Sequence, residues 1–146
     1  IDFDDNFNEF INAHKDEYEQ IGSEKFLANY ASTRYTDLIN RAVIELEKNL
    51  SVVIAAPFSK QLQDQTLWDE LTLPIKKFDS KPTLYWVVIS DELRKKRLVT
   101  RGEKRDAEKI KKIDEYIKFS PAKTPVVEHV LVQGDKGYEG QLKGNG

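Results

Sequence analysis

Residues 83–89 read Thr-Leu-Tyr-Trp-Val-Val-Ile, and residues 90–101, which follow at once, read Ser-Asp-Glu-Leu-Arg-Lys-Lys-Arg-Leu-Val-Thr-Arg. The first stretch is a continuous run of β-branched and aromatic residues, typical of a strand that is covered on both faces of a parallel sheet. The second stretch is charged and begins with a capping residue, Ser90 or Asp91, which predicts a helix that runs to about Arg101. A buried strand that leads directly into a helix indicates an α/β fold.

Three further segments have the composition of strands, and helical patterns separate them. The strand candidates are the first five residues, residues 51–56 (Ser-Val-Val-Ile-Ala-Ala) and residues 126–132. Helical spacing of apolar residues covers residues 7–14, 23–50, 67–78 and 106–119, with a break expected at Pro74. Strands that alternate with helices predict a three-layer α/β/α fold with a mainly parallel sheet. We expect one domain over residues 1–133 and a loop-like or disordered tail over residues 134–146.

The composition of the 146 residues narrows the class of protein. The length allows one domain with a real core, and a formal net charge of −2 gives no general attraction to nucleic acid. No apolar run approaches the roughly 20 residues of a membrane-spanning helix, and the first residues lack the pattern of a secretory signal. Because there is no cysteine, we expect neither a disulfide framework nor a thiolate metal site, and the two histidines are too far apart in sequence to indicate a zinc site. A cytoplasmic protein without a membrane partner is the expectation.

Ten lysines and arginines lie between residues 94 and 112, the densest basic segment of the chain. On a helix, Arg94, Arg97 and Arg101 fall on one face, and Arg105 follows Gly102, where the backbone can turn. Guanidinium groups that converge in this way can each bind two phosphate oxygens (bidentate binding) and can stabilise charge during phosphoryl transfer. The same pattern also fits a solvated basic helix whose charges are paired with nearby carboxylates. Nucleic acid is a less suitable partner, since the basic residues lack interleaved aromatic ones.

Asp4 and Asp5 lie at the end of the first strand candidate. In open parallel sheets ligands lie beyond the carboxyl ends of the strands, so either carboxylate could orient or deprotonate an acceptor hydroxyl, or hold Mg²⁺ through water. Alternatively, Asp5 or Asn6 caps the helix that follows. Phe58, after the second strand candidate, stands where it could line an acceptor pocket, although aromatic residues near strand ends are more often part of the core.

Together these segments resemble the P-loop kinases. The likeness rests on the two aspartates after a strand, on residues 55–59 (Ala-Ala-Pro-Phe-Ser) and on residues 91–98 (Asp-Glu-Leu-Arg-Lys-Lys-Arg-Leu). Within that superfamily the chain is similar to bacterial ATP-binding proteins related to adenylate kinase and to zeta-toxin-like kinases. Residues 101–106, Lys109 and residues 114–116 resemble the lid of those proteins. The likeness covers about residues 1–132.

The resemblance implies ATP-dependent phosphoryl transfer to a small molecule or a nucleotide, with ATP and Mg²⁺ as cofactors. It places a lid at about residues 94–119. It makes Arg97, Arg101 and Arg105 lid arginines that reach nucleotide or acceptor phosphates, and Asp4 or Asp5 the carboxylate that faces the acceptor. With Phe58, chosen from its position in the chain, these residues are the candidate catalytic, nucleotide-binding and acceptor-binding residues.

Two departures from the family pattern keep an alternative open. No G-x-x-x-x-G-K-[ST] phosphate loop occurs in the sequence, and Ala55 stands where an acidic metal-site residue is expected. The alternative is therefore a non-catalytic module that binds a nucleotide or a partner. Removing the central strand of such a sheet would leave buried backbone groups unpaired, at a cost of about 1–3 kcal/mol each. We accordingly expect a phosphate-loop segment before Ile1 in the parent chain.

Overall fold

The computed structural model describes residues 1–102, 107–119 and 122–142. The chain divides into two compact units, Ile1–Pro82 and Thr83–Gly146. Sequence analysis gives no linker at this boundary. Each unit has its own elements and its own parallel backbone pairing, and each is described here by itself.

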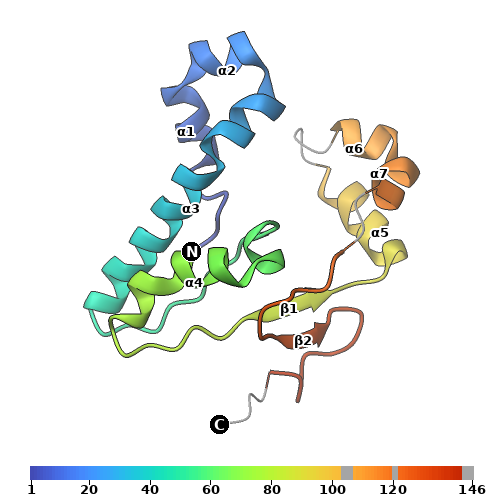
Figure 1. Cartoon of the computed structure of the whole chain (residues 1–146). Coiled ribbons are helices and arrows are strands. Elements are labelled where there is room, and N and C mark those ends of the chain that lie inside the picture. Colours follow the sequence, from blue (N-terminus) through green and yellow to red (C-terminus); the bar gives the residue numbers. More distant parts are fainter. Residues whose placement is uncertain (103–106, 120–121, 143–146) are drawn as a thin grey trace. The chain divides into compact units, whose positions relative to one another are not determined.

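Helices make up most of the first unit. They are α1 (Phe7–Ala13), α2 (Lys15–Ile21), α3 (Ser23–Glu47), the short 3-10 helix η1 (Gln61–Gln63) and α4 (Gln65–Lys76). The two short helices α1 and α2 fold back at the amino-terminal end of α3, while α4 lies along its carboxyl-terminal half (Figure 1). Gly22, with a φ of 81°, allows the chain to reverse between α2 and α3.

The core of the first unit is formed mainly by one face of α3. Phe26 and Leu38 are fully buried, and Ile39 and Ala42 are nearly so. The rings of Tyr18, Tyr30 and Phe10 lie around Phe26, at centroid distances of 5.3, 4.6 and 5.6 Å. Full burial of a side chain such as that of Phe26 or Leu38 stabilises the fold by about 1.5–3 kcal/mol. This aromatic packing fixes α1 and α2 on α3.

Residues 1–3 pair in parallel with residues 53–55. The Ile1 nitrogen donates to the Val53 carbonyl (2.8 Å), Ala55 N–H to the Ile1 carbonyl (2.9 Å) and Phe3 N–H to the Ala55 carbonyl (2.9 Å). The result is an isolated bridge between Asp2 and Ala55 rather than an extended sheet.

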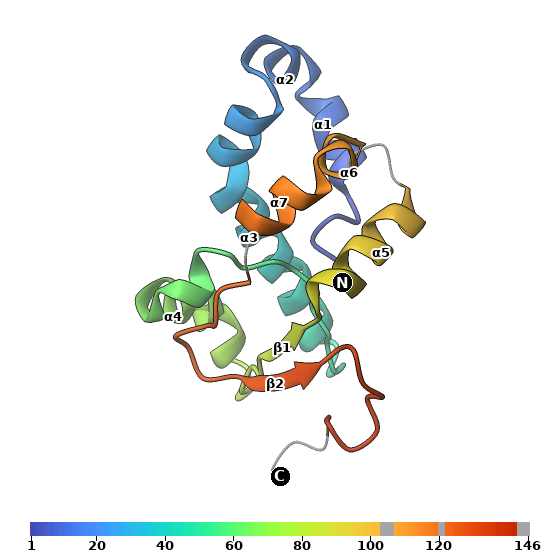
Figure 2. The same ribbon diagram turned by 90° about the vertical axis from the view of Figure 1, so that its right-hand side faces the viewer.

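The second unit is a β–α–β arrangement. Its elements are β1 (Tyr85–Val88), α5 (Asp91–Arg101), α6 (Ala107–Lys111), α7 (Ile113–Phe119) and β2 (Val130–Gln133). The two strands run parallel and side by side, with Tyr85 opposite Val130 and Val88 opposite Gln133 (Figure 2). Because parallel strands need a crossover, α5, α6 and α7 form the connection between them.

Few apolar side chains are buried in the described part of the second unit. Ile117, Val127 and Val132 are the buried apolar ones, whereas Tyr85 and Val87 in β1 are 40% and 53% exposed. The strand predicted for residues 83–89 is therefore present, but the expectation that it is covered on both faces is wrong.

The predicted three-layer α/β/α fold is wrong as well. The described residues are mostly helical, and their one sheet has two strands. Residues 51–56, expected to be a covered strand, are extended, and only alternate side chains are partly buried, so that Val53 remains 82% exposed. A continuous apolar run fits both a covered strand and an extended segment packed on one side, because strand side chains alternate between two faces.

Three smaller expectations are also corrected. Pro74 does not break α4, which continues to Lys76: the proline removes one helical hydrogen bond, and only two helical residues follow it. The helix predicted over residues 106–119 is divided into α6 and α7 at Lys112. Asn6 occupies the N-cap position of α1 but makes no capping hydrogen bond with its side chain, which donates instead to Asp37 (3.2 Å).

In the described ranges, no helix combines the length and apolar character that crossing a bilayer requires.

Candidate functional site

Helix α5 begins and ends where the sequence predicts. The Ser90 hydroxyl oxygen accepts the N–H of Leu93 at 3.2 Å, and Asp91 and Glu92 lie in the first turn, where the helix dipole favours negative charge. Gly102 closes the helix in the left-handed conformation, with a φ of 57°. The predictions of a Ser90 cap and of an interruption at Gly102 are confirmed.

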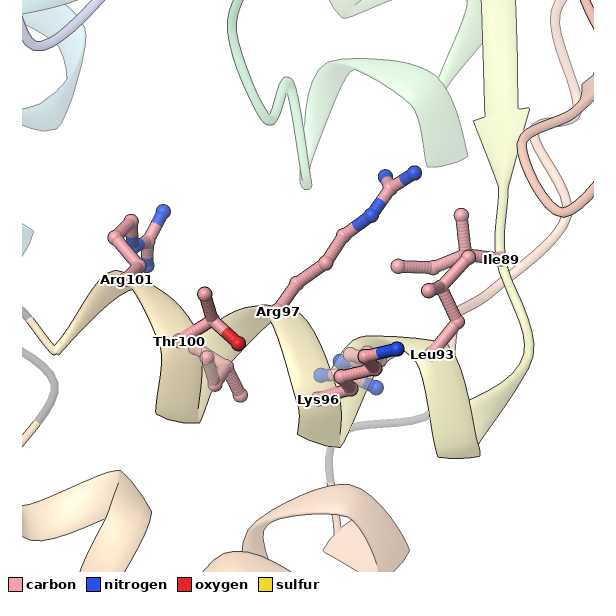
Figure 3. Close-up of a pocket in the computed structure, with 8 residues that line it drawn as sticks. Ile89, Leu93, Lys96, Arg97, Thr100 and Arg101 are labelled. Carbon is pink, nitrogen blue, oxygen red and sulfur yellow. The ribbon is translucent and has the colours of Figure 1, made fainter.

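A pocket of about 650 Å³ lies against α5. Its lining consists of one side of the helix and the residue that follows β1: Ile89, Leu93, Arg94, Lys96, Arg97, Leu98, Thr100 and Arg101. Four of these residues are cationic and none is acidic, while most of the surface that they present to the pocket is apolar. In Figure 3, Arg97 extends from α5 in the direction of the end of β1, and Arg101 lies one turn further along the helix.

Arg97 is held at the sheet end of the pocket. Its Nη2 donates to the Gly134 carbonyl at 3.5 Å, just beyond the end of β2. Nearby, Asp135 accepts the Ser90 N–H with its two oxygens, at 3.0 and 3.2 Å. Hydrogen bonds from the Ser90 side chain and backbone, aided by the charge of Arg97, lower the pKa of Asp135 below its usual value. The carboxyl ends of both strands thus meet the start of α5.

Helix α7 packs beside α5 and engages other basic side chains. The Arg94 guanidinium lies 5.0 Å from the centre of the Tyr116 ring, within the range of a cation–π contact. Lys95 donates to Asp114, and this hydrogen bond raises the pKa of the Lys95 ammonium. Lys95 does not line the pocket, whereas Arg94 both lines it and contacts α7.

The residues predicted from sequence fall into different parts of the chain. Arg97 and Arg101 line the α5 pocket. Arg105 lies outside the described residues. Asp4 and Asp5 belong to the first unit, where Asp4 pairs with Arg34 at 3.1 Å and Asp5 lies 4.0 Å from Arg41.

Phe58 is part of the core of the first unit. It is 8% exposed, and its ring lies 5.5 Å from that of Tyr35 and 5.6 Å, edge to face, from that of Trp68. This packing agrees with the more common role of an aromatic residue near a strand end. The prediction that Phe58, Asp4 and Asp5 contact an acceptor stays a prediction.

Gly134 and Asp135 are not among the site residues predicted from the sequence. A signal for them does exist in the sequence: a glycine and an aspartate follow the strand candidate of residues 126–132 after one intervening residue. In parallel sheets, ligands lie at the edge where strands end in this way. Lys96 and Thr100 also line the pocket. They were not predicted, because the three- and four-residue steps of a helix select only the arginines at positions 94, 97 and 101.

The cationic side chains that line the pocket belong to the class of groups that binds anions. Guanidinium and ammonium groups pair with phosphate oxygens. No group of three or more histidine, aspartate or glutamate side chains in the described ranges is arranged to hold a metal ion. Comparisons of the chain with protein-family models, with curated proteins and with solved structures find no match.

Proposed function

We propose that the α5 pocket binds the phosphate groups of a nucleotide, and that the protein uses it in ATP-dependent phosphoryl transfer to a small molecule or a second nucleotide. The observation that carries the proposal is the lining of the pocket, which has four cations and no carboxylate. The resemblance of about residues 94–119 to a kinase lid supports it. A cytoplasmic location belongs to the same proposal.

The arginines of α5 would act by position and charge. Arg94 and Arg101 are seven residues apart, which corresponds to about 10 Å along the helix axis, enough to meet several phosphate groups in a row. ATP would supply the transferred phosphoryl group. Arg97 and Arg101 would bind its oxygens and stabilise the charge that they carry during transfer, while apolar Ile89 and Leu93 would limit access of water.

The experiment that tests this function compares single substitutions on one helix. Arg97→Ala and Arg101→Ala should each weaken ATP binding about tenfold, measured by calorimetry at low salt. They should lower turnover, measured as ADP release across a panel of acceptors, by at least about 100-fold. The matched control is Lys95→Ala, which removes a charge from the same helix but not from the pocket. Equal ATP affinity in the two arginine variants and the control would refute the assignment of the pocket.

A second candidate is a module that binds a nucleotide without turning it over. Two observations favour it: Ala55 stands where an acidic metal-site residue is expected, and Asp4 and Asp5 lie near arginines in the first unit. This candidate predicts that ATP stabilises the protein in a thermal shift experiment while no acceptor in the panel causes ADP release. ADP release that Arg97→Ala abolishes would exclude it.

A further inference from the structure

The turn after β2 is tied to both β1 and α5. Gly134 N–H donates to the Val88 carbonyl at 2.7 Å, so the hydrogen bonding of the sheet continues one residue beyond β2. The next residue, Asp135, accepts the backbone N–H of Ser90, the N-cap residue of α5. Two consecutive residues thus join the end of β2 to the end of β1 and to the first turn of the helix.

Gly134 fits closely against β1. A Cβ at this position would lie 2.6 Å from Ile89 Cγ2 and 3.2 Å from Val87 Cγ1. These distances are shorter than ordinary van der Waals contacts, and both contacting atoms belong to β-branched side chains, which have little rotamer freedom. The absence of a side chain at residue 134 therefore allows the turn to pack on β1.

The turn is closed by a side chain as well. The Gln141 side-chain carbonyl accepts the Gln133 N–H at 2.7 Å, and its amide nitrogen donates to the carbonyls of Gln133 (3.2 Å) and Gly137 (2.6 Å). Residues 134–140 are accordingly held at both ends. The Gly134 carbonyl that accepts Arg97 has a fixed position, because bonds on either side of it restrain the backbone.

We propose that Asp135 is a positioning residue of the α5 pocket, which acts through Ser90 and Gly134 to fix the place where Arg97 meets a bound phosphate. This inference deepens the proposed function and rests on it. The carboxylate does not touch the ligand in this arrangement. It fixes the start of α5 relative to the Gly134 carbonyl, so that Arg97 is already oriented when the anion binds. Less conformational entropy of the Arg97 side chain is then lost on binding.

A different role for Asp135 leads to opposite results. If its carboxylate acted only as a negative charge that competes with the ligand for Arg97, every neutral substitution would strengthen phosphate binding. If it acted only on stability, the folded variants would bind as the wild type does. Positioning by hydrogen bonding instead predicts that Asn, which keeps an acceptor oxygen, replaces Asp, whereas Ala does not.

The test uses tripolyphosphate as the probe, since the lining cations extend over about 10 Å of helix. Calorimetry on the full chain at low salt should give similar affinities for the wild type and Asp135→Asn, and an affinity about tenfold lower for Asp135→Ala. Gly134→Ala keeps the carboxylate but forces the turn away from Ile89, and should weaken binding as Asp135→Ala does. If Asp135→Ala does not fold, Gly134→Ala serves as the test variant in its place. Wild-type affinity in folded Asp135→Ala or Gly134→Ala, or tighter binding by both neutral Asp135 variants, would overturn the positioning role while leaving phosphate binding intact.

A measurement without ligand separates this inference from the proposed function. The Arg97 Nε–Hε signal, assigned in NMR spectra by its loss in Arg97→Lys, should show a rigid guanidinium in the wild type and in Asp135→Asn. It should become mobile in Asp135→Ala. Equal mobility in all three proteins would overturn the positioning role whether or not tripolyphosphate binds. Failure of the wild type to bind the probe would instead refute the proposed function.

Discussion

Arg34 illustrates, at the scale of single residues, how a charged side chain can belong to a core. Its side chain is 9% exposed, and its Nη2 donates to the Phe3 carbonyl at 3.0 Å and to Asp4 at 3.1 Å. The guanidinium also lies 3.9 Å from the centre of the Phe3 ring. Arg34 therefore fastens the first residues of the chain to α3.

Substitution of Arg34 should be costly. Arg34→Ala removes two charge-assisted hydrogen bonds and a cation–π contact, and we expect it to lower the free energy of unfolding of the first unit by about 2–4 kcal/mol. Lys15→Ala is the control, because its ion pair with Glu19 is exposed and should contribute less than about 0.5 kcal/mol. Urea unfolding of both variants measures the difference, and equal losses would contradict a structural role for Arg34.

Asp135 should give the second unit a pH-dependent stability. Its pKa is lowered in the folded state, so its contribution is complete above the unfolded value near 3.8 and is lost as the pH falls through the lower folded value. We expect the free energy of unfolding of the second unit to decrease below about pH 4 by less in Asp135→Asn than in the wild type. Acid titrations of urea midpoints test this, and parallel titration curves for the two proteins would contradict it.

The residue contacts show why only part of the site was predictable. Arg97 and Arg101 could be chosen because helical spacing places them on one face. The contact between Asp135 and Ser90 joins residues 45 positions apart, and no periodic pattern in the sequence marks it. Likewise, sequence alone gives no indication that Arg34 pairs with Asp4.

At the scale of elements, the start and the end of α5 were predictable, since capping depends on residues adjacent in the chain. The course of residues 51–56 was not, because whether an apolar run is covered depends on packing that the run itself does not encode. The same holds for Pro74, whose effect depends on its place within α4. Local signals are thus reliable at helix ends and poor for strand coverage.

The end of α5 provides a quantitative check at this scale. Gly102→Ala should destabilise the second unit by about 1 kcal/mol, because alanine is strained at a φ of 57°, although among the described residues a Cβ meets only the Val99 carbonyl, at 3.7 Å. Gly137→Ala is the control: it lies in open space without a positive φ, and should change stability by less than about 0.5 kcal/mol. A loss in Gly137→Ala as large as in Gly102→Ala would show that the left-handed cap is not responsible.

At the scale of the whole molecule, the two units differ in the number of buried side chains and each contains one tryptophan. Among the described residues, eight buried apolar side chains belong to the first unit and three, Ile117, Val127 and Val132, to the second. Trp68 lies in α4 of the first unit and Trp86 in β1 of the second. Fluorescence can therefore follow each unit separately.

We expect the second unit to unfold at a lower urea concentration than the first. The Trp68→Phe variant reports on Trp86 alone, and Trp86→Phe reports on Trp68 alone. A lower midpoint for the Trp86 signal follows from the smaller number of apolar side chains that are buried in the described part of its unit. Coincident transitions in the two variants would mean that the chain unfolds as one cooperative body and would contradict this expectation.

The same pair of variants gives the most direct measurement of whether the cationic pocket on α5 binds phosphate. Urea unfolding of Trp68→Phe should shift to higher midpoints with ATP, by an amount equivalent to about 2.7 kcal/mol at a concentration 100 times the dissociation constant. The shift should disappear when Arg97→Ala and Arg101→Ala are added. An unchanged Trp86 midpoint with ATP at low salt, or an equal shift after both arginines are removed, would contradict the assignment of this pocket.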